Sequence, residues 1–217
     1  MSEAERGISR LQQSLANKKR NAKPQVVSLS GQDLVKLDYF LPDQKLPLLI
    51  QPAKVDVDLA SWVKSNTAFL QKQLYQHGAI LFRDFALRSQ EDFSNYLTSI
   101  EAPLVHYMEG ATPRAELGSH IYTSTLFPAD QTIAQHNELS YTRTWPMLIW
   151  FFCVTPAEKG GETPLADMRK VLQRISATTY EQFERKGWML VRNFAQGFGL
   201  PWQTSFRSQT KEEVEKY

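Results

Sequence analysis

The sequence is poor in three features, and each scarcity excludes a class of protein. Its single cysteine, Cys153, rules out a disulfide framework within the chain and fits a reducing compartment. Its longest uninterrupted apolar run, Met147 to Val154, is far shorter than the ~20 residues that a membrane helix needs. The formal net charge is only +2, with acids and bases mixed along the chain. The concentrated basic face that nucleic-acid binding requires is therefore not expected.

The N-terminus also lacks the apolar stretch of a secretory signal, because charges begin at Glu3. We expect a soluble, cytoplasmic protein. Residues 1–40 are predicted to form a charged N-terminal extension, and residues 41–217 to belong to one domain. The basic cluster at 18–20 is interpreted as a solvated patch, with contact to an acidic surface as the alternative.

The remaining chain has the material for a core, with 42% hydrophobic and 12% aromatic residues. Compact apolar runs predict strands at 47–52, 79–85, 146–156 and 188–194, and a short strand is expected after the glycines at 160–161. The strand at 146–156 is expected to be fully buried, with Cys153 as a buried structural thiol. The fold class expected from these runs is mixed α/β, mainly β.

Apolar residues at helical spacing predict one helix over 58–77, ended by Gly78, and further helices over 89–100, 168–175 and 178–187. Capping boxes are expected at Ser89, Thr178 and Thr210, each with an acidic residue three positions later. Residues 101–135 show no sustained period and are predicted to be a long loop with brief strands. Long loops inside compact domains are usually functional.

The stretch "QHNELS" (135–140) contains two candidate metal ligands, His136 and Glu138. In an extended segment residues i and i+2 point to the same side, so His136 and Glu138 would present an imidazole and a carboxylate together. With a second histidine they would form the two-histidine, one-carboxylate face that holds iron(II). By itself the spacing is a weak signal, and two polar residues at a strand end explain it as well.

The wider context makes the iron site the better interpretation. The chain resembles the taurine dioxygenase and clavaminate synthase-like family of iron(II)/2-oxoglutarate-dependent oxygenases from about Leu46 onward. The resemblance rests on three segments taken together: "HGAILFRDF" (77–85), "QHNELSYTRTWPMLIWFFCVTPAEKGGETPLADMRKVLQRI" (135–175) and "VRNFAQGFGLPWQTSF" (191–206). It implies a double-stranded β-helix, a jelly-roll-like barrel with flanking helices, and it implies iron(II) and 2-oxoglutarate as cofactor and cosubstrate.

The resemblance also implies roles for single residues. His136 and Glu138 would be the first two iron ligands, and Thr163 would contact a carboxylate of 2-oxoglutarate. Tyr122, Thr123 and Ser124 would line the substrate side, although each is equally explained as a hydrogen-bonding loop residue. Related halogenases replace the carboxylate ligand, so Glu138 favours hydroxylation or a related oxidation such as desaturation. The segments "LPLLIQP" and "GLPWQTSF", with the H-x-E, look most like members of peptide natural-product pathways, which hydroxylate free or carrier-bound amino acids. An oxygenase of other small carboxylate-containing substrates is the alternative, and a carrier protein is a candidate partner for which the sequence marks no exposed patch.

The resemblance is incomplete at the C-terminal end. The family takes a distal histidine and a 2-oxoglutarate-binding arginine from strands further along, but His136 is the last of four histidines here. Neither Arg192 nor Arg207 occupies that arginine's position, and His77, His106 and His120 precede the motif. We therefore expect an N-terminal part of an oxygenase, inactive alone, with open sheet edges that pair in a homo-oligomer. The alternative is a non-catalytic remnant that binds a partner.

Overall fold

The computed structural model describes residues 31–110, 114–124, 128, 131–194, 197 and 199–216, so the predicted basic tail lies outside the described residues. The elements in chain order are η1 (Gly31–Leu34), β1 (Val35–Leu41), β2 (Gln44–Pro52), α2 (Leu59–Ser65), α3 (Thr67–His77), β3 (Ile80–Phe82), α4 (Gln90–Ser99), β4 (Glu116–Gly118), β5 (Ile121–Tyr122), α5 (Met168–Arg174), α6 (Ala177–Lys186), α7 (Trp202–Phe206) and α8 (Lys211–Lys216). No helix among them is long and apolar enough to cross a membrane.

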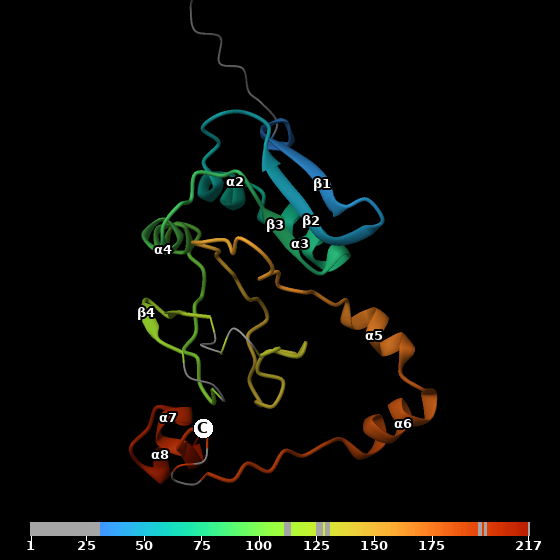
Figure 1. Cartoon of the computed structure of the whole chain (residues 1–217), viewed down its shortest axis with the longest axis vertical. Coiled ribbons are helices and arrows are strands. Elements are labelled where there is room, and N and C mark those ends of the chain that lie inside the picture. The colour runs from blue at the N-terminus through green and yellow to red at the C-terminus, as the bar shows by residue number, and fades with distance from the viewer. Residues whose placement is uncertain are drawn as a thin grey trace, which may run out of the picture.

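The main sheet has the strand order β1-β2-β3, with β2 in the middle (Figure 1). β1 pairs antiparallel with β2, and β3 pairs parallel with β2 on its other side. The predicted strand at 47–52 is confirmed as part of β2, whereas only Ile80–Phe82 of the strand predicted at 79–85 forms β3. β1 begins at Val35, ahead of the predicted domain boundary at residue 41.

The single helix predicted over 58–77 is wrong, because Asn66 separates α2 from α3. Asn66 has the non-helical angles φ −125° and ψ 23°. Its side chain donates to the Trp62 carbonyl, and the hydroxyls of Ser65 and Thr67 likewise donate to carbonyls four residues back. Polar side chains that compete for backbone groups in this way weaken a helix. Gly78 ends α3 as predicted, with φ 84°.

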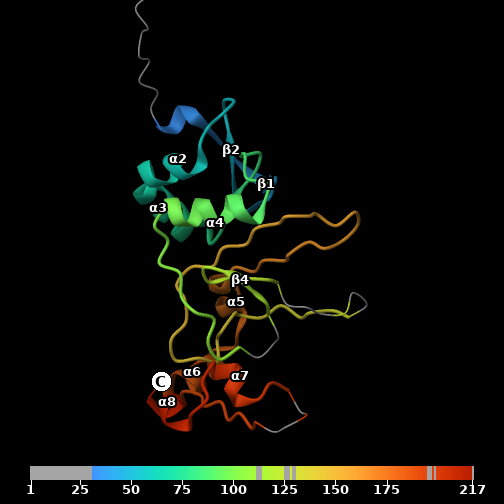
Figure 2. The ribbon, with the colours of Figure 1, turned by 90° about the vertical axis from the view of Figure 1, so that its left-hand side faces the viewer.

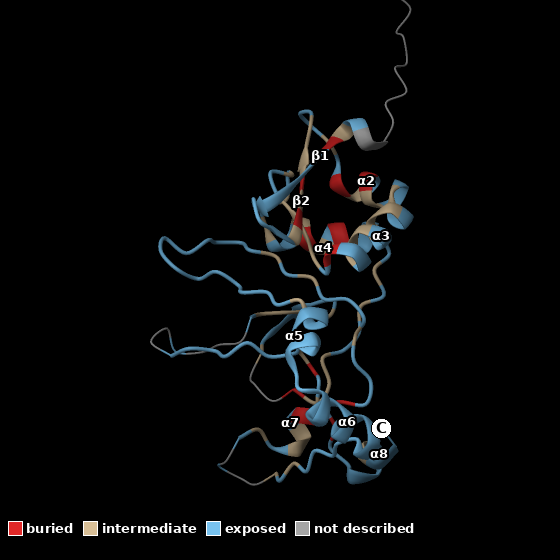
Figure 3. Cartoon of the chain, turned by 90° about the vertical axis from the view of Figure 1, so that its right-hand side faces the viewer, coloured by how far each residue is buried: buried red, intermediate tan, exposed pale blue. Residues whose placement is uncertain are grey.

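The core lies between the sheet and helices α2, α3 and α4. Val35, Leu48 and Ile50 pack with Trp62 in one cluster, and Leu59 packs with three α4 residues in a second: Phe93, Tyr96 and Leu97. Figure 3 shows most of the buried residues in this part of the molecule.

The start of α4 confirms the capping box predicted at Ser89. The Ser89 hydroxyl accepts from the Asp92 N–H at 3.0 Å, and the Asp92 carboxylate accepts from the Ser89 N–H at 2.9 Å. A hydrogen bond from the Arg88 N–H to the Asp92 carboxylate, followed by those from Ser89, holds the pKa of Asp92 below its usual range. The cap fixes where α4 begins, and its apolar side then meets the second cluster.

The chain after residue 135 is much more open. Within the described part of residues 146–166 and 188–194 there are no strands, so the strands predicted at 146–156, after residue 161 and at 188–194 are wrong. Met147 is 84% exposed and Phe151 70%, and Cys153 is exposed instead of buried. Figure 2 shows residues 150–165 as a long loop that projects from the body. Apolar runs form strands only beside a hydrogen-bonding partner, and these have none among the described residues.

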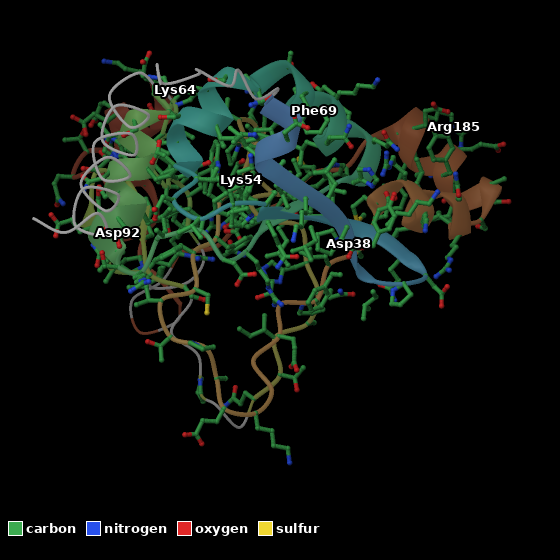
Figure 4. The ribbon with its side chains drawn as sticks, turned by 90° about the horizontal axis from the view of Figure 1, so that it is seen from above. Asp38, Lys54, Lys64, Phe69, Asp92 and Arg185 are labelled. Carbon is green, nitrogen blue, oxygen red and sulfur yellow. The ribbon has the colours of Figure 1, made fainter. Side chains whose placement is uncertain are left out.

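Helices α5 and α6 are regular but bury no residue. Seen from above, Arg185 of α6 lies at the opposite edge of the molecule from Asp92 of α4 (Figure 4). The side chain of Arg169 joins the start of α5 to the end of α3 by donating to the carbonyls of Tyr75 and Gln76. This is a favourable place for a cation, since the last carbonyls of a helix carry partial negative charge.

Of the two remaining capping boxes, one is half confirmed and one is wrong. Thr210 accepts from the Glu213 N–H at 3.4 Å at the start of α8, as expected, but the Thr210 N–H and the Glu213 carboxylate both bond to the Ser208 hydroxyl instead of to each other. The N-cap of α6 is Ser176, which accepts from the Thr179 N–H two residues before the predicted Thr178, so Thr178 is inside the helix.

The mixed α/β class is confirmed, whereas the expected predominance of strands is wrong for the described residues, where helices hold more residues than strands. Those residues form a three-stranded sheet and a two-stranded hairpin. The double-stranded β-helix therefore remains an expectation that comes from the family resemblance.

Candidate functional site

His136 and Glu138 lie in an irregular segment that follows the β4–β5 hairpin. Glu138 begins a turn whose next residue, Leu139, is buried and has a φ of 52°. The buried hydroxyl of Thr142 closes the turn by donating to the carbonyls of Leu139 and Thr144. Buried Leu139 and hydrogen-bonded Thr142 thus fix the backbone position of Glu138.

The imidazole and the carboxylate lie side by side, as predicted. Nε2 of His136 is 3.6 Å from Oε2 of Glu138. Asn137 between them is exposed. The expected setting, a strand facing the interior of a β-sandwich, is not what the structure shows, since the pair lies in a loop and the His136 side chain is 58% exposed.

The hydrogen bond at the other ring nitrogen sets the tautomer of His136. Nδ1 lies 2.8 Å from the carbonyl oxygen of Ala134. A carbonyl oxygen can only accept, so Nδ1 carries the proton. In the neutral ring Nε2 then holds its lone pair toward Glu138. Metal-binding histidines in proteins are oriented by this kind of bond to a backbone carbonyl.

The Glu138 carboxylate is held by two side chains from an earlier part of the chain. The Tyr107 hydroxyl donates to Oε1 at 2.8 Å, and Nη2 of Arg114 lies 3.5 Å from both oxygens. The Arg114 guanidinium also stacks over the Tyr107 ring at 5.0 Å. Burial, and next the hydrogen bond to Glu138, raise the pKa of Tyr107. The tyrosine therefore remains a hydrogen-bond donor to the carboxylate over the whole physiological range.

Sequence reasoning missed Tyr107 and Arg114. They are 31 and 24 positions away from Glu138, in a loop without periodicity. No local pattern marks them, and the only available signal was that residues 101–135 were expected to be functional.

The donor set fits a divalent transition metal. Ligand atoms that each lie ~2.0–2.2 Å from one cation can be no more than ~4.4 Å apart, and 3.6 Å satisfies this limit. One neutral imidazole nitrogen and one carboxylate oxygen are suitable ligands for iron(II).

Of the other histidines, His77 is a buried helix-end residue as expected, with Nδ1 2.9 Å from the Lys45 carbonyl oxygen.

The predicted substrate-side residues lie close to the pair. The Tyr122 hydroxyl accepts from the Tyr107 N–H at 3.3 Å. The Thr123 carbonyl accepts from Arg114 at 3.4 Å, and the Thr123 hydroxyl accepts from the Ala115 N–H at 3.0 Å. Tyr122 and Thr123 thus help to position the two side chains that hold Glu138, whereas Ser124 is exposed.

The structure does not bring Thr163 to the pair. Thr163 is exposed in an irregular segment, and none of the hydrogen bonds found among the described residues involves it. Gly160 and Gly161 precede it with φ angles of 71° and 77°, which residues with side chains rarely adopt. The role of Thr163 toward 2-oxoglutarate stays a prediction.

A second group of side chains that could hold a metal ion lies at the β4–β5 hairpin. The ligand atoms of His106, Glu116 and His120 are all within 4.8 Å of one another. Arg207 donates to Oε2 of Glu116 at 2.6 Å, and this bond holds the pKa of Glu116 below its usual range. Arg192, the other arginine excluded as a cosubstrate ligand, donates to the Glu109 carbonyl and lies over the rings of Tyr141 and Phe194.

Comparison with known proteins shows which protein family the chain resembles. Residues 42–217 match the model of the taurine catabolism dioxygenase TauD, TfdA family. The chain is 39% identical over 144 residues to the dapdiamide synthesis protein DdaC of Enterobacter agglomerans, an alignment that covers 66% of this chain and 44% of that protein. It is 25% identical over 207 residues to a clavaminate synthase-like protein of Arabidopsis thaliana, covering 85% of this chain and 63% of the relative.

The chain therefore spans about half to two thirds of the length of these curated relatives. The match nevertheless includes the segment with His136 and Glu138 and extends over most of the residues described above. The chain belongs to the taurine catabolism dioxygenase TauD, TfdA family.

Proposed function

We propose that the chain contributes the His136 and Glu138 ligands of an iron(II)- and 2-oxoglutarate-dependent oxygenase. The observation that supports this most directly is the orientation of the pair. The Nε2 lone pair of His136 and Oε2 of Glu138 face each other at 3.6 Å, and the Ala134 carbonyl fixes the ring in the metal-binding tautomer. When bound, iron(II) supplies the redox chemistry that couples decarboxylation of 2-oxoglutarate to oxidation of a substrate C–H bond.

The chain's own residues would perform the positioning. Tyr107 and Arg114 hold the Glu138 carboxylate by donating to it, so it does not need to be reoriented when a cation arrives. The 58% exposure of the His136 side chain leaves a face of the site open to small molecules.

The proposed substrate is an amino acid or another small carboxylate-containing molecule, and the reaction is a hydroxylation or desaturation. The names of both relatives refer to the synthesis of a named compound, which supports a small-molecule substrate over a macromolecule. In this proposal Thr163 contacts 2-oxoglutarate, and Tyr122, Thr123 and Ser124 face the substrate side. The protein would act in the cytoplasm, where a reducing environment preserves the exposed thiol of Cys153.

Anaerobic titration of the purified chain with iron(II) against a chromophoric chelator tests the proposal. His136→Ala and Glu138→Ala should each lower iron affinity at least ~10-fold, because each removes one of few protein ligands. Asn137→Ala is the matched control: it changes the exposed residue between them and should leave affinity unchanged. Equal iron affinity in all three variants would contradict the assignment.

Cosubstrate binding gives a milder second readout. If Thr163 contacts 2-oxoglutarate, the cosubstrate should tighten iron binding less in Thr163→Val than in the unmodified chain, since one hydrogen bond to a charged group contributes only ~1.5–3 kcal/mol. We expect little or no succinate from the 217 residues alone, because they hold no histidine after His136. Succinate formation at a steady rate would show that His106, His120 or a second copy completes the site.

The exposed apolar residues support a second candidate function, binding of a protein partner without catalysis. Met147, Phe151 and Met189 are 84%, 70% and 85% exposed. Surfaces of this kind mark interaction sites. Normal iron binding that depends on His136 and Glu138 would favour the oxygenase over this alternative.

A further inference from the structure

The group formed by His106, Glu116 and His120 uses neither His136 nor Glu138. Its ligand atoms lie within 4.8 Å of one another, and the rings of His106 and His120 are 4.0 Å apart at an angle of 77°. Nδ1 of His120 is 3.8 Å from Oε1 of Glu116. Two imidazoles and one carboxylate from two segments of the chain therefore converge on one small volume.

The polar atoms of this group are not satisfied by each other. Nδ1 of His120 is buried and has no hydrogen-bond partner, one of two such side-chain atoms found among the described residues. A buried polar atom without a partner is costly, and in native proteins it calls for an explanation such as a bound ion. The distance of 3.8 Å to Glu116 is too long for a hydrogen bond but within the ~4.4 Å that one cation can bridge.

The two oxygens of the Glu116 carboxylate have different neighbours, and one oxygen is left for a cation. Oε2 accepts from Arg207, whose guanidinium also stacks over the Tyr122 ring at 5.1 Å. Oε1 points to His120. Carboxylate ligands of metals are commonly held by such an outer hydrogen bond, which orients the free oxygen. The Arg207 charge is balanced by the same carboxylate, so it does not exclude a cation bound mainly by two neutral imidazoles.

The backbone of the hairpin is also unusual at this point. Ser119 and His120 form its two-residue turn, with φ angles of 51° and 62°. Turns of this type normally use glycine or asparagine, because side chains disfavour positive φ. The strained turn directs the His120 ring back over β4, next to Glu116.

We propose that His106, Glu116 and His120 form a second metal site that binds a divalent first-row transition cation of the zinc type. Imidazole and carboxylate ligands in this ratio suit zinc and its neighbours and disfavour magnesium or calcium, which prefer oxygen ligands. The 4.8 Å within which all ligand atoms lie exceeds the ~4.4 Å bridging limit by at most about 0.4 Å, which rotation of the exposed His106 ring can close. Bound metal would fasten the β4–β5 hairpin to the segment that follows α4.

Cobalt(II) and zinc(II), added as simple salts, are the probes for the test, and His136→Ala is the background that removes the first site. In this background the chain should still bind one cobalt ion with visible absorption bands, and zinc should displace it. Adding His120→Ala or Glu116→Gln should lower cobalt affinity at least ~10-fold. Adding Asn137→Ala should change nothing. Circular dichroism confirms that each variant keeps its helices.

Three results would overturn the second site or its proposed ligand chemistry, and they differ from a failure of the proposed function. If His136→Ala alone abolishes cobalt binding, the group at the hairpin binds no metal and the oxygenase assignment stands. If His136→Ala still binds cobalt but His120→Ala and Glu116→Gln have no further effect, the residual site lies elsewhere. Magnesium displacing cobalt as well as zinc does would contradict the proposed ligand chemistry.

Discussion

Two segments of similar apolar composition form different structures in this protein, one a buried strand and the other an exposed irregular segment. Residues 44–52 form β2, which pairs with β1 on one side and β3 on the other, and Ile50 is fully buried. Residues 146–156 are at least as apolar, yet they form no strand, and Met147 is 84% exposed. Only Trp150 and Phe152 of this second segment pack against the core, with Phe152 stacked on Phe93 at 5.0 Å. Apolar composition makes a strand possible, and a pairing partner makes it form.

The comparison predicts that equal truncations in the two segments have very different effects. Ile50→Ala should lower the free energy of unfolding by about 2–5 kcal/mol, because it leaves a cavity in a closed core. Phe151→Ala removes a larger side chain that is 70% exposed and should change it by less than about 0.5 kcal/mol. Urea unfolding followed by circular dichroism measures both. Similar losses would show that residues 146–156 are packed in solution.

A second effect, nearly as large, is a pH dependence of stability that comes from Tyr96 in the packed region. Burial raises the pKa of Tyr96 to about 12. The unfolded chain releases this proton near pH ~10, so between pH ~10 and ~12 ionisation lowers the free energy of the unfolded state but not that of the folded state. Stability from this group is complete below pH ~10 and falls by roughly 2–3 kcal/mol as the pH rises to ~12.

Spectrophotometric titration of tyrosine ionisation, with Tyr96→Phe as the control, checks this expectation. The variant should lose one late-titrating tyrosine. An unchanged titration curve would show that Tyr96 is open to water, and the packed region would then resemble the open one.

The third prediction concerns the candidate site, which lies between the two regions. Tyr107→Phe removes the 2.8 Å hydrogen bond to Glu138 and keeps the ring over which Arg114 stacks. Iron affinity should fall about 10-fold to 100-fold, as is usual when a metal ligand loses its outer hydrogen bond. Tyr75→Phe, at a residue that is 70% exposed on α3, is the control. If both variants bind iron like the unmodified chain, Tyr107 has no positioning role.

The smallest expected difference compares two helix caps. Ser89→Ala removes the N-cap of α4, whose residues Phe93 and Tyr96 are in the core, and should cost about 1 kcal/mol of global stability. Ser176→Ala removes the same kind of cap from α6, which buries no residue. Its loss should increase local fraying and leave global unfolding unchanged, because α6 is not coupled to the core. Amide hydrogen exchange of α6 with urea unfolding separates the two, and equal global losses would show that α6 packs on the body.

The sequence predicted secondary structure correctly where residues a few positions apart determine it. The glycine stop of α3, the Ser89 capping box and the strands within β2 and β3 were all found from patterns a few residues long. It failed where the outcome depended on distant partners, as for the strands at 146–156 and 188–194 and for Cys153. It also failed at Asn66, where three polar side chains together interrupt a helical pattern that is otherwise continuous.

For the candidate site, the sequence by itself determined the two side chains, His136 and Glu138, and their adjacency. His136 and Glu138 are two positions apart, and this separation alone limits how far their side chains can diverge. Family membership follows from the sequence too. Only the tertiary structure decided how the two side chains are oriented. The Ala134 carbonyl selects the tautomer of His136, and the Tyr107 and Arg114 contacts hold the Glu138 carboxylate. The tertiary structure alone brought His106 to Glu116 and His120. Short-range geometry is fixed by covalent spacing, whereas contacts across tens of residues depend on where the chain turns and what it buries.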